Sequence, residues 1–276
     1  MGNIFVIGPR KSGKTTYLAG LAYWSQRKKA LRQKSMFTVH PVNEDARYLI
    51  EQARNIILSG ESLEGTTIPL GGVSDLPIYS FQIEVERRLK KKETINLVVK
   101  DAAGEIFDEL ESGSVKSEHE DFFQDFLMKD VGGCLILLTD WQGDSDDSYT
   151  QKLSTFTDLI DFYERNRDLR VAVAISKCER GELWPGRLDP ELDLFNLHLP
   201  QTKLLLRTKI APENLRFFAL STFGVLGRND PRPNRMDELG SNSIQSVLRE
   251  PEQWQPYGMF SPLYWLSTGK RIGLNA

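Results

Sequence analysis

The sequence predicts an α/β fold with a mostly parallel central sheet, one antiparallel edge hairpin and helices on both faces. Two observations lead to this prediction. Short apolar runs of strand length alternate with segments whose apolar residues recur at helical spacing. One pair of neighbouring runs lies close enough along the chain to form a hairpin, whereas the other runs are separated by helical segments, which is typical of parallel strands.

The first elements flank a glycine-rich loop. Asn3–Ile7 is a short apolar run and predicts a buried strand, and Thr15–Ser25 predicts the helix that leaves the loop. Asn43–Leu58 carries apolar residues at helical spacing and stops at Ser59-Gly60, so we expect a second helix there.

The antiparallel pair follows. Ile78–Glu86 alternates residue by residue, which predicts a strand with one buried face, and Ile95–Val99 predicts its partner. The charged run Arg87–Glu93 between them fits a solvated hairpin tip, because Glu86 precedes it and Glu93 ends it. A binding patch is the alternative interpretation of this run.

The rest of the chain repeats strand and helix. Val225–Gln255 is rich in Pro, Asn, Gly and charge and is expected to be a long surface connection. We expect strands at Gly133–Leu138, Val171–Ile175 and Leu215–Leu220, and helices at Glu118–Lys129, Tyr149–Asn166, Pro190–Lys209 and Pro262–Ser267.

Composition limits the class of protein. The 276 residues carry a formal net charge of −3, which argues against a general nucleic-acid binder. Apolar runs such as Gly132–Leu138 are too short to span a membrane, and the N-terminus lacks the features of a signal peptide. Cys134 and Cys178 lie in apolar segments and are expected to be reduced core thiols of a cytoplasmic protein.

The domain organisation is expected to be simple. We expect one domain over residues 1–276, which accounts for the order of the elements. Insertions are expected near 38–76, 180–212 and 225–258. The last helix ends close to the C-terminus, so the chain is also compatible with an excised domain.

The loop after the first strand matches the pattern G-x-x-x-x-G-K-[ST] completely, and this match completes the prediction of a P-loop NTPase fold. Its backbone N–H groups and the following helix N-terminus would cradle phosphates. Lys14 would reach the β- and γ-phosphates and is expected to face solvent until phosphate arrives, and Thr15 would ligate Mg²⁺. The expected contact residues are Gly8, Arg10, Lys11, Ser12, Gly13, Lys14, Thr15 and Thr16.

A second motif ends the strand at Ile95–Val99. Asp101 is the expected acidic partner of Mg²⁺, and Gly104 completes an Asp-x-x-Gly pattern whose glycine N–H can contact the γ-phosphate. Together with the phosphate loop, this motif resembles the Ras-like P-loop GTPases. The resemblance implies that Ala102 to about Ser117 forms a mobile second switch.

Two further segments resemble the guanine-recognition loops of that family. Ser176-Lys177-Cys178-Glu179 aligns with Asn-Lys-x-Asp, with Ser for Asn and Glu for Asp. The resemblance implies that Glu179 accepts both N–H groups of guanine and that the Lys177 stem covers the base. Ser221-Thr222 resembles the Ser-Ala loop whose backbone contacts guanine O6. A buried strand ending in polar residues is the alternative interpretation of each segment.

The first switch should supply a threonine to Mg²⁺. Thr66 and Thr67 precede the alternating strand, and Thr67 is our choice, whereas Thr38 lies in an apolar, strand-like piece. The chain resembles most the bacterial double-GTPase relatives of the Ras-like group. Three features carry this resemblance: an extra helix before this segment, Glu105 after Asp-x-x-Gly, and the closing "WQPYGMFSPLYWL".

The implied activity is slow, Mg²⁺-dependent GTP hydrolysis. Ras-type enzymes have Gln where this chain has Glu105, whose charge near the γ-phosphate needs a counterion such as Arg10 or an arginine from a partner. An ordinary helix-start acid is the alternative role of Glu105. His40, His119 and His198 form no ligand spacing.

Three functions follow from these motifs. The first is a GTP/GDP switch that controls a protein effector or responds to an activating partner, with no nucleic acid and no membrane span. The others are a nucleotide-binding assembly module without turnover and an ATP-using P-loop enzyme.

Overall fold

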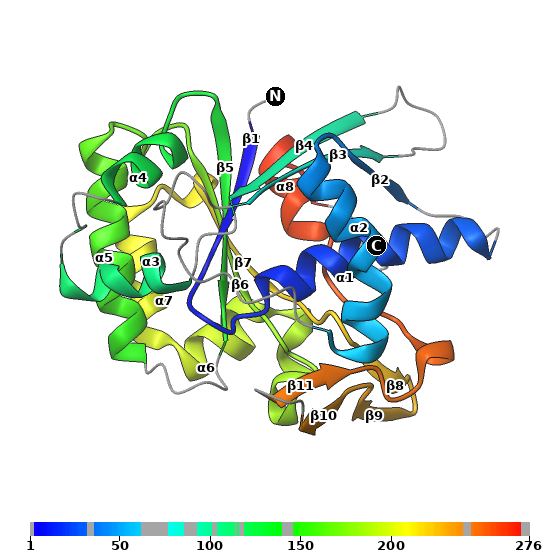
Figure 1. Cartoon of the computed structure of the whole chain (residues 1–276). Helices are drawn as coiled ribbons and strands as arrows, with labels where there is room; N and C mark the ends of the chain where they lie inside the picture. The colour runs from blue at the N-terminus through cyan, green and yellow to red at the C-terminus, as the bar shows by residue number, and fades with distance from the viewer. Residues whose placement is uncertain are drawn as a thin grey trace.

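A seven-stranded sheet forms the centre of the molecule (Figure 1). The computed structural model describes residues 3–31, 36–61, 77–85, 93–100, 104–113, 115, 119–139, 146–239 and 244–271. The strand order is β2-β3-β4-β1-β5-β6-β7. The strands are β1 (Asn3–Ile7), β2 (Phe37–Pro41), β3 (Ile78–Val85), β4 (Glu93–Lys100), β5 (Val131–Leu138), β6 (Arg170–Ile175) and β7 (Leu215–Ala219).

The sheet is parallel except at one side. β1 pairs in parallel with β4 and β5, and β6 and β7 continue the parallel series. β3 runs antiparallel to both β4 and β2. The predicted fold class is therefore confirmed, and the predicted hairpin gains a third strand, β2, which contains Thr38.

Helices cover both faces of the sheet. In Figure 1, α1, α2 and α8 lie to the right of the sheet, and α3, α4, α5 and α7 lie to the left. Side chains of β1 point alternately to the two faces of the sheet. Ile4 and Val6 therefore join one buried core, and Phe5 and Ile7 join the other. The helices are α1 (Lys14–Ala30), α2 (Glu44–Ser59), α3 (Gly104–Glu109), α4 (Glu120–Phe126), α5 (Asp146–Phe162), α6 (Asn196–His198), α7 (Pro200–Lys209) and α8 (Ser261–Thr268).

Local chemistry sets the ends of α2 where the sequence predicts them. The Asn43 side chain accepts a hydrogen bond from the Ala46 N–H at 3.1 Å and caps the N-terminus. Gly60 ends the helix in the left-handed conformation, with φ 68°. Asn43 also bonds the Ile78 carbonyl, so the same residue ties α2 to β3.

The single helix predicted for Pro190–Lys209 is wrong. A π-helical turn, Glu191–Phe195, runs into α6, and α7 begins separately at Pro200. Leu199 leaves the helical region, with φ −135° and ψ 53°, because the residue before a proline is sterically disfavoured in the α conformation.

The surface connection predicted for Val225–Gln255 contains two hairpins. These are β8 (Val225–Gly227) with β9 (Asp230–Pro233), and β10 (Met236–Leu239) with β11 (Ile244–Val247). Prolines in β9 weaken the strand pattern, and two-stranded pairing depends on the protein beside it rather than on local propensity. Figure 1 places these four strands together beside α2.

The loops after β1, β6 and β7 lie at one edge of the sheet. These strands and β4 are parallel, so their carboxyl ends lie on the same side. In open α/β sheets this edge is where ligands bind.

Among the described residues, no helix combines the length and apolarity needed to cross a membrane.

Candidate functional site

The loop after β1 turns tightly because of two glycines. A Cβ on Gly8 would lie 2.2 Å from the Leu137 carbonyl oxygen, so a larger residue would force β1 away from β5. Gly13, just before α1, has φ 90°, a conformation that side chains disfavour. Its carbonyl accepts the first helical hydrogen bond of α1, from the Tyr17 N–H at 2.8 Å.

Lys14 is buried, with 8% of its surface exposed. Its ammonium donates to the carbonyls of Gly8 at 2.7 Å and Pro9 at 2.9 Å. The expectation that Lys14 faces solvent until phosphate arrives is therefore wrong. The loop wraps around the side chain, which sequence spacing does not reveal, and the cation is already positioned inside the loop.

Ser12 is the second buried polar residue of the loop. It has no exposed surface, and its Oγ has no hydrogen-bond partner among the described residues. A buried hydroxyl without a partner is costly, and a polar atom of a ligand would satisfy it. Of the other loop residues, Arg10 and Lys11 are exposed, and Thr15 and Thr16 are partly buried in the first turn of α1.

The start of α3 lies against this loop. A Cβ on Gly104 would lie 2.1 Å from the Arg10 nitrogen and 2.6 Å from the Pro9 carbonyl carbon. Only glycine permits this approach, which brings the end of the predicted Asp-x-x-Gly motif to the phosphate loop. Glu105 follows in α3, but its side chain, Asp101, Thr66 and Thr67 lie outside the described residues. The predicted second switch, Ala102 to about Ser117, is described over residues 104–113 and at 115, where it forms α3 and a 3-10 turn at Leu110–Ser112. Its mobility stays a prediction, and its other residues lie outside the described part of the chain.

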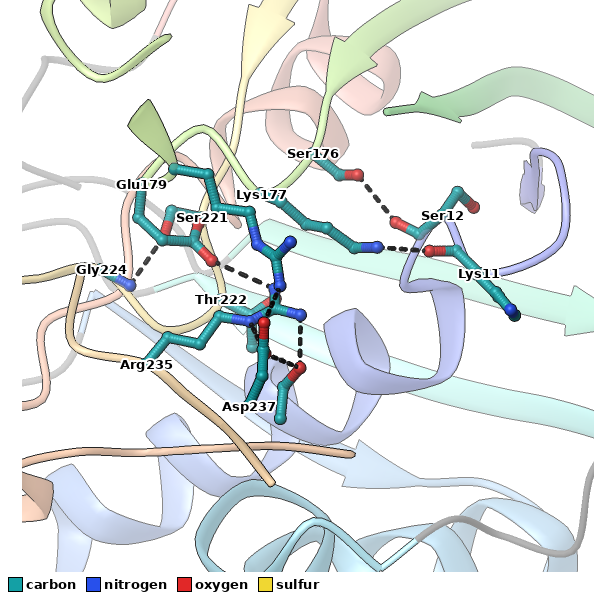
Figure 2. A network of polar contacts seen from close by, with 12 residues as sticks. Lys11, Ser12, Ser176, Lys177, Glu179, Ser221, Thr222, Gly224, Arg235 and Asp237 are labelled. Carbon is teal, nitrogen blue, oxygen red and sulfur yellow. Dashed lines mark hydrogen bonds and ion pairs between the residues drawn. The ribbon is translucent and has the colours of Figure 1, made fainter. Parts of the chain in front are cut away.

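The loop after β6 is tied directly to the phosphate loop. The Ser176 hydroxyl donates to the Ser12 carbonyl at 2.7 Å, and the Lys177 ammonium donates to the Lys11 carbonyl at 2.6 Å (Figure 2). Lys177 adopts a left-handed conformation, φ 57°, that is uncommon for a residue with a side chain. Ser176 and Lys177 therefore connect the loop after β6 to the phosphate loop.

Burial lowers the pKa of Lys177 to about 7, and the charges of Arg235 and Arg180 add to this effect. Glu179 and Asp237 oppose it. Two cations close to a largely buried ammonium favour its neutral form.

This pKa predicts a pH dependence of stability. Between pH 7 and the ordinary lysine value of 10.5, the unfolded chain holds the proton that the folded Lys177 has released. The free energy of unfolding should therefore rise with pH in this window, by at most about 1.4 kcal/mol per pH unit. Urea unfolding at pH 7, 8 and 9 should show a steeper rise for the parent than for Lys177→Met. Lys29→Met, at an exposed position of α1, serves as the control and should parallel the parent.

Glu179 is a buried carboxylate, with 1% of its surface exposed. Its Oε1 lies 3.5 Å from a guanidinium nitrogen of Arg235, and its Oε2 has no partner among the described residues. Figure 2 places Glu179 and Arg235 together beside Ser221 and Thr222. Sequence reasoning identified Glu179 but missed Arg235, which lies in the stretch predicted as a surface connection.

Contacts from the C-terminal part of the chain fix the loop after β7. Ser221 and Tyr257 exchange backbone hydrogen bonds of 2.9 Å, and the Ser221 hydroxyl accepts from the Gly224 N–H at 2.7 Å. The Thr222 carbonyl accepts from the Trp254 indole at 2.7 Å. The Ser221 N–H is thus used within the protein.

Of the cysteines and His119, only Cys178 belongs to these loops, since it lies in the loop after β6. Cys134 and Cys178 are free and buried, as predicted. His119 is buried and its Nδ1 lies 2.6 Å from Glu109. In the part of the chain that the structure describes, no cluster of His, Cys, Asp and Glu side chains forms a metal site.

Comparison with known proteins finds no matching family model and no matching curated protein. Among solved structures, the S. cerevisiae Ski7 GTPase-like domain bound to GTP is similar at 17% identity and a TM-score of 0.46, over 98% of this chain and 50% of that chain. Sup35 complexed with GDP is similar at 10% identity and a TM-score of 0.33, over 80% and 37% of the two chains. This chain thus spans half or less of these proteins, and the likeness to bacterial double-GTPase relatives stays a prediction.

Proposed function

We propose that this protein is a GTP-binding switch that hydrolyses GTP slowly with Mg²⁺ and acts through a protein partner. The observation that carries the proposal is the direct connection between its two predicted nucleotide loops. Ser176 and Lys177, next to Glu179, bond to the phosphate loop at Ser12 and Lys11. In the proposed binding mode, one nucleotide contacts Lys14 with its phosphates and Glu179 with its base.

Unpartnered polar atoms support a ligand at both ends of this site. Glu179 Oε2 and Ser12 Oγ are buried and lack partners in the described part of the chain. Guanine offers two adjacent N–H groups to a carboxylate, whereas adenine offers an acceptor at N1, which the same carboxylate would repel.

The residues suit Mg²⁺ bound together with a nucleotide. This ion keeps several waters and takes one or two protein ligands plus phosphate oxygens, so it needs no closed cluster of side chains. Thr15, in the first turn of α1, would be one ligand, and Asp101 and Thr67 are proposed as the others. Bound Mg²⁺ would neutralise charge on the phosphates during transfer.

Slow turnover follows from the charge of Glu105. A carboxylate beside the γ-phosphate can orient water but repels the developing negative charge, unless Arg10 or a partner's arginine compensates it. A nucleotide-binding assembly module without turnover is the second candidate, because Glu105 replaces the glutamine of Ras-type enzymes. Two buried free cysteines favour a cytoplasmic setting.

Thermal unfolding with nucleotides tests the proposal. GTP with Mg²⁺, at a concentration a hundredfold above its Kd, should stabilise the fold by about 2.7 kcal/mol, which corresponds to a Tm increase of about 5 °C. ATP at the same concentration should raise Tm by less than about 1 °C. An equal or larger effect of ATP would favour the ATP-using enzyme instead. Phosphate release from GTP over hours separates the slow hydrolase from the module that lacks turnover.

A further inference from the structure

Arg235 brings a positive charge to the predicted base site from a distant part of the chain. It lies between β9 and β10, and its guanidinium faces the Glu179 carboxylate at 3.5 Å. Both side chains are buried, with 9% of Arg235 and 1% of Glu179 exposed. A carboxylate buried this deeply requires a compensating charge, and Arg235 supplies one.

Contacts other than Glu179 hold Arg235 in place. Its Nε donates to Asp237 Oδ1 at 2.8 Å, another of its nitrogens donates to the Ser246 hydroxyl, and its guanidinium lies 5.4 Å from the centre of the Phe223 ring. Asp237 is itself held by Arg180, at 2.6 Å. The hairpin of β10 and β11 therefore fixes the guanidinium independently of the carboxylate.

The backbone beside Arg235 is equally fixed. Asn234 is fully buried and bonds through its side chain to both the carbonyl and the N–H of Glu250. Its own N–H donates to the Gly224 carbonyl at 2.9 Å, and Gly224 donates to the Ser221 hydroxyl. A continuous series of hydrogen bonds thus joins the Arg235 segment to the loop after β7.

The Arg235–Glu179 contact leaves the carboxylate able to bind a ligand. At 3.5 Å it is longer than the 2.7–2.9 Å usual for charge-assisted hydrogen bonds, and it involves Oε1 alone. Among the described residues, nothing donates a hydrogen bond to Oε2, which can therefore accept one from a ligand. Arg235 compensates the charge of Glu179 without occupying both oxygens.

From this geometry we infer that Arg235 is a positioning residue for base selection: it compensates and orients Glu179, so that the carboxylate accepts the paired N–H groups of guanine. The inference rests on the proposed function. It assigns a role in nucleotide specificity to Arg235 and to the β10–β11 hairpin that holds it, which contribute no residue to the predicted phosphate contacts.

Nucleotide affinities of Arg235 variants test this role. Arg235→Ala should weaken GTP binding about tenfold and ATP binding less than about threefold, because only guanine depends on the oriented carboxylate. Arg235→Lys keeps a cation and should retain most of the GTP preference. Arg232→Ala, an exposed arginine of β9 paired with Asp230, is the matched control and should leave both affinities unchanged.

A double-mutant cycle separates this role from a merely structural one. In a Glu179→Ala background, Arg235→Ala should have no further effect on the ratio of GTP to ATP affinity, because the two residues act through one contact. An equal loss of both nucleotides in Arg235→Ala would mean that the arginine only supports the hairpin. A gain in GTP affinity would mean that Arg235 obstructs the base site, and either result overturns the inference.

Folding and the proposed function are controlled in the same experiment. Circular dichroism and Tm show whether each variant is folded. If Arg235→Ala does not fold, Ser246→Ala takes its place, because it removes one contact of the arginine and keeps the charge. Ser246→Ala should lower the ratio of GTP to ATP affinity about threefold. A parent protein that binds GTP no better than ATP would refute guanine selection itself. If the parent prefers GTP and Arg235→Ala has the same ratio of GTP to ATP affinity, only the inference on Arg235 is refuted.

Discussion

Replacing Lys14 with alanine is expected to weaken triphosphate binding by at least about a hundredfold. The ammonium is held inside the phosphate loop by the carbonyls of Gly8 and Pro9, so it is positioned before a ligand arrives. Charge-assisted hydrogen bonds to phosphate oxygens contribute about 1.5–3 kcal/mol each, and loss of two such bonds corresponds to at least about a hundredfold in affinity. Isothermal titration with GTP and Mg²⁺ measures this loss directly.

Stability must be measured alongside binding, because Lys14 is buried. Its removal deprives two loop carbonyls of their donor, which should cost about 1–3 kcal/mol of unfolding free energy. Lys29→Ala, at an exposed position near the end of the same helix, should change neither the affinity nor the stability. A folded Lys14→Ala protein with parental affinity would rule out the phosphate-loop function.

Thr15→Ala should reduce GTP affinity only when Mg²⁺ is present.

Features that depend on residues close together in the sequence could be predicted, and features that depend on distant residues could not. The phosphate loop, the strand ends and the caps of α2 depend on residues a few positions apart, so their patterns can be read along the chain. The burial of Lys14 depends on how the loop closes around it. The break at Pro200 carried a local signal, the proline itself, that helical periodicity outweighed.

Arg235 shows where sequence reasoning reaches its limit. It lies 56 positions after Glu179, in a stretch rich in proline and asparagine that lacks strand periodicity. Its place beside the carboxylate depends on the Asn234 contacts and on the β10–β11 hairpin, both of which form only in the folded protein.

The identity of the base contact yields the last prediction, and Glu179→Gln tests it. Glutamine preserves the size of the side chain but presents one acceptor and one donor in place of two acceptors. Guanine would then lose one hydrogen bond and place its amino group against the amide donor, so GTP affinity should fall about a hundredfold. Xanthine offers an N–H and a carbonyl oxygen at the same edge, which match the amide. Xanthosine triphosphate should therefore bind Glu179→Gln better than the parent.

This exchange of preference distinguishes base recognition from a general loss of structure, because a damaged site would lose both nucleotides. Glu182→Gln, an exposed acid three residues further along the chain, is the control and should bind GTP as the parent does. Glu179→Ala should lose GTP affinity without gaining xanthosine triphosphate, since alanine offers neither acceptor nor donor. Competition of both triphosphates against a fluorescent guanine nucleotide measures all four proteins on one scale. Parental GTP affinity in Glu179→Gln would reduce Glu179 to a buried strand-end acid whose role is to hold Arg235, and guanine selection would then depend on the Ser221-Thr222 backbone.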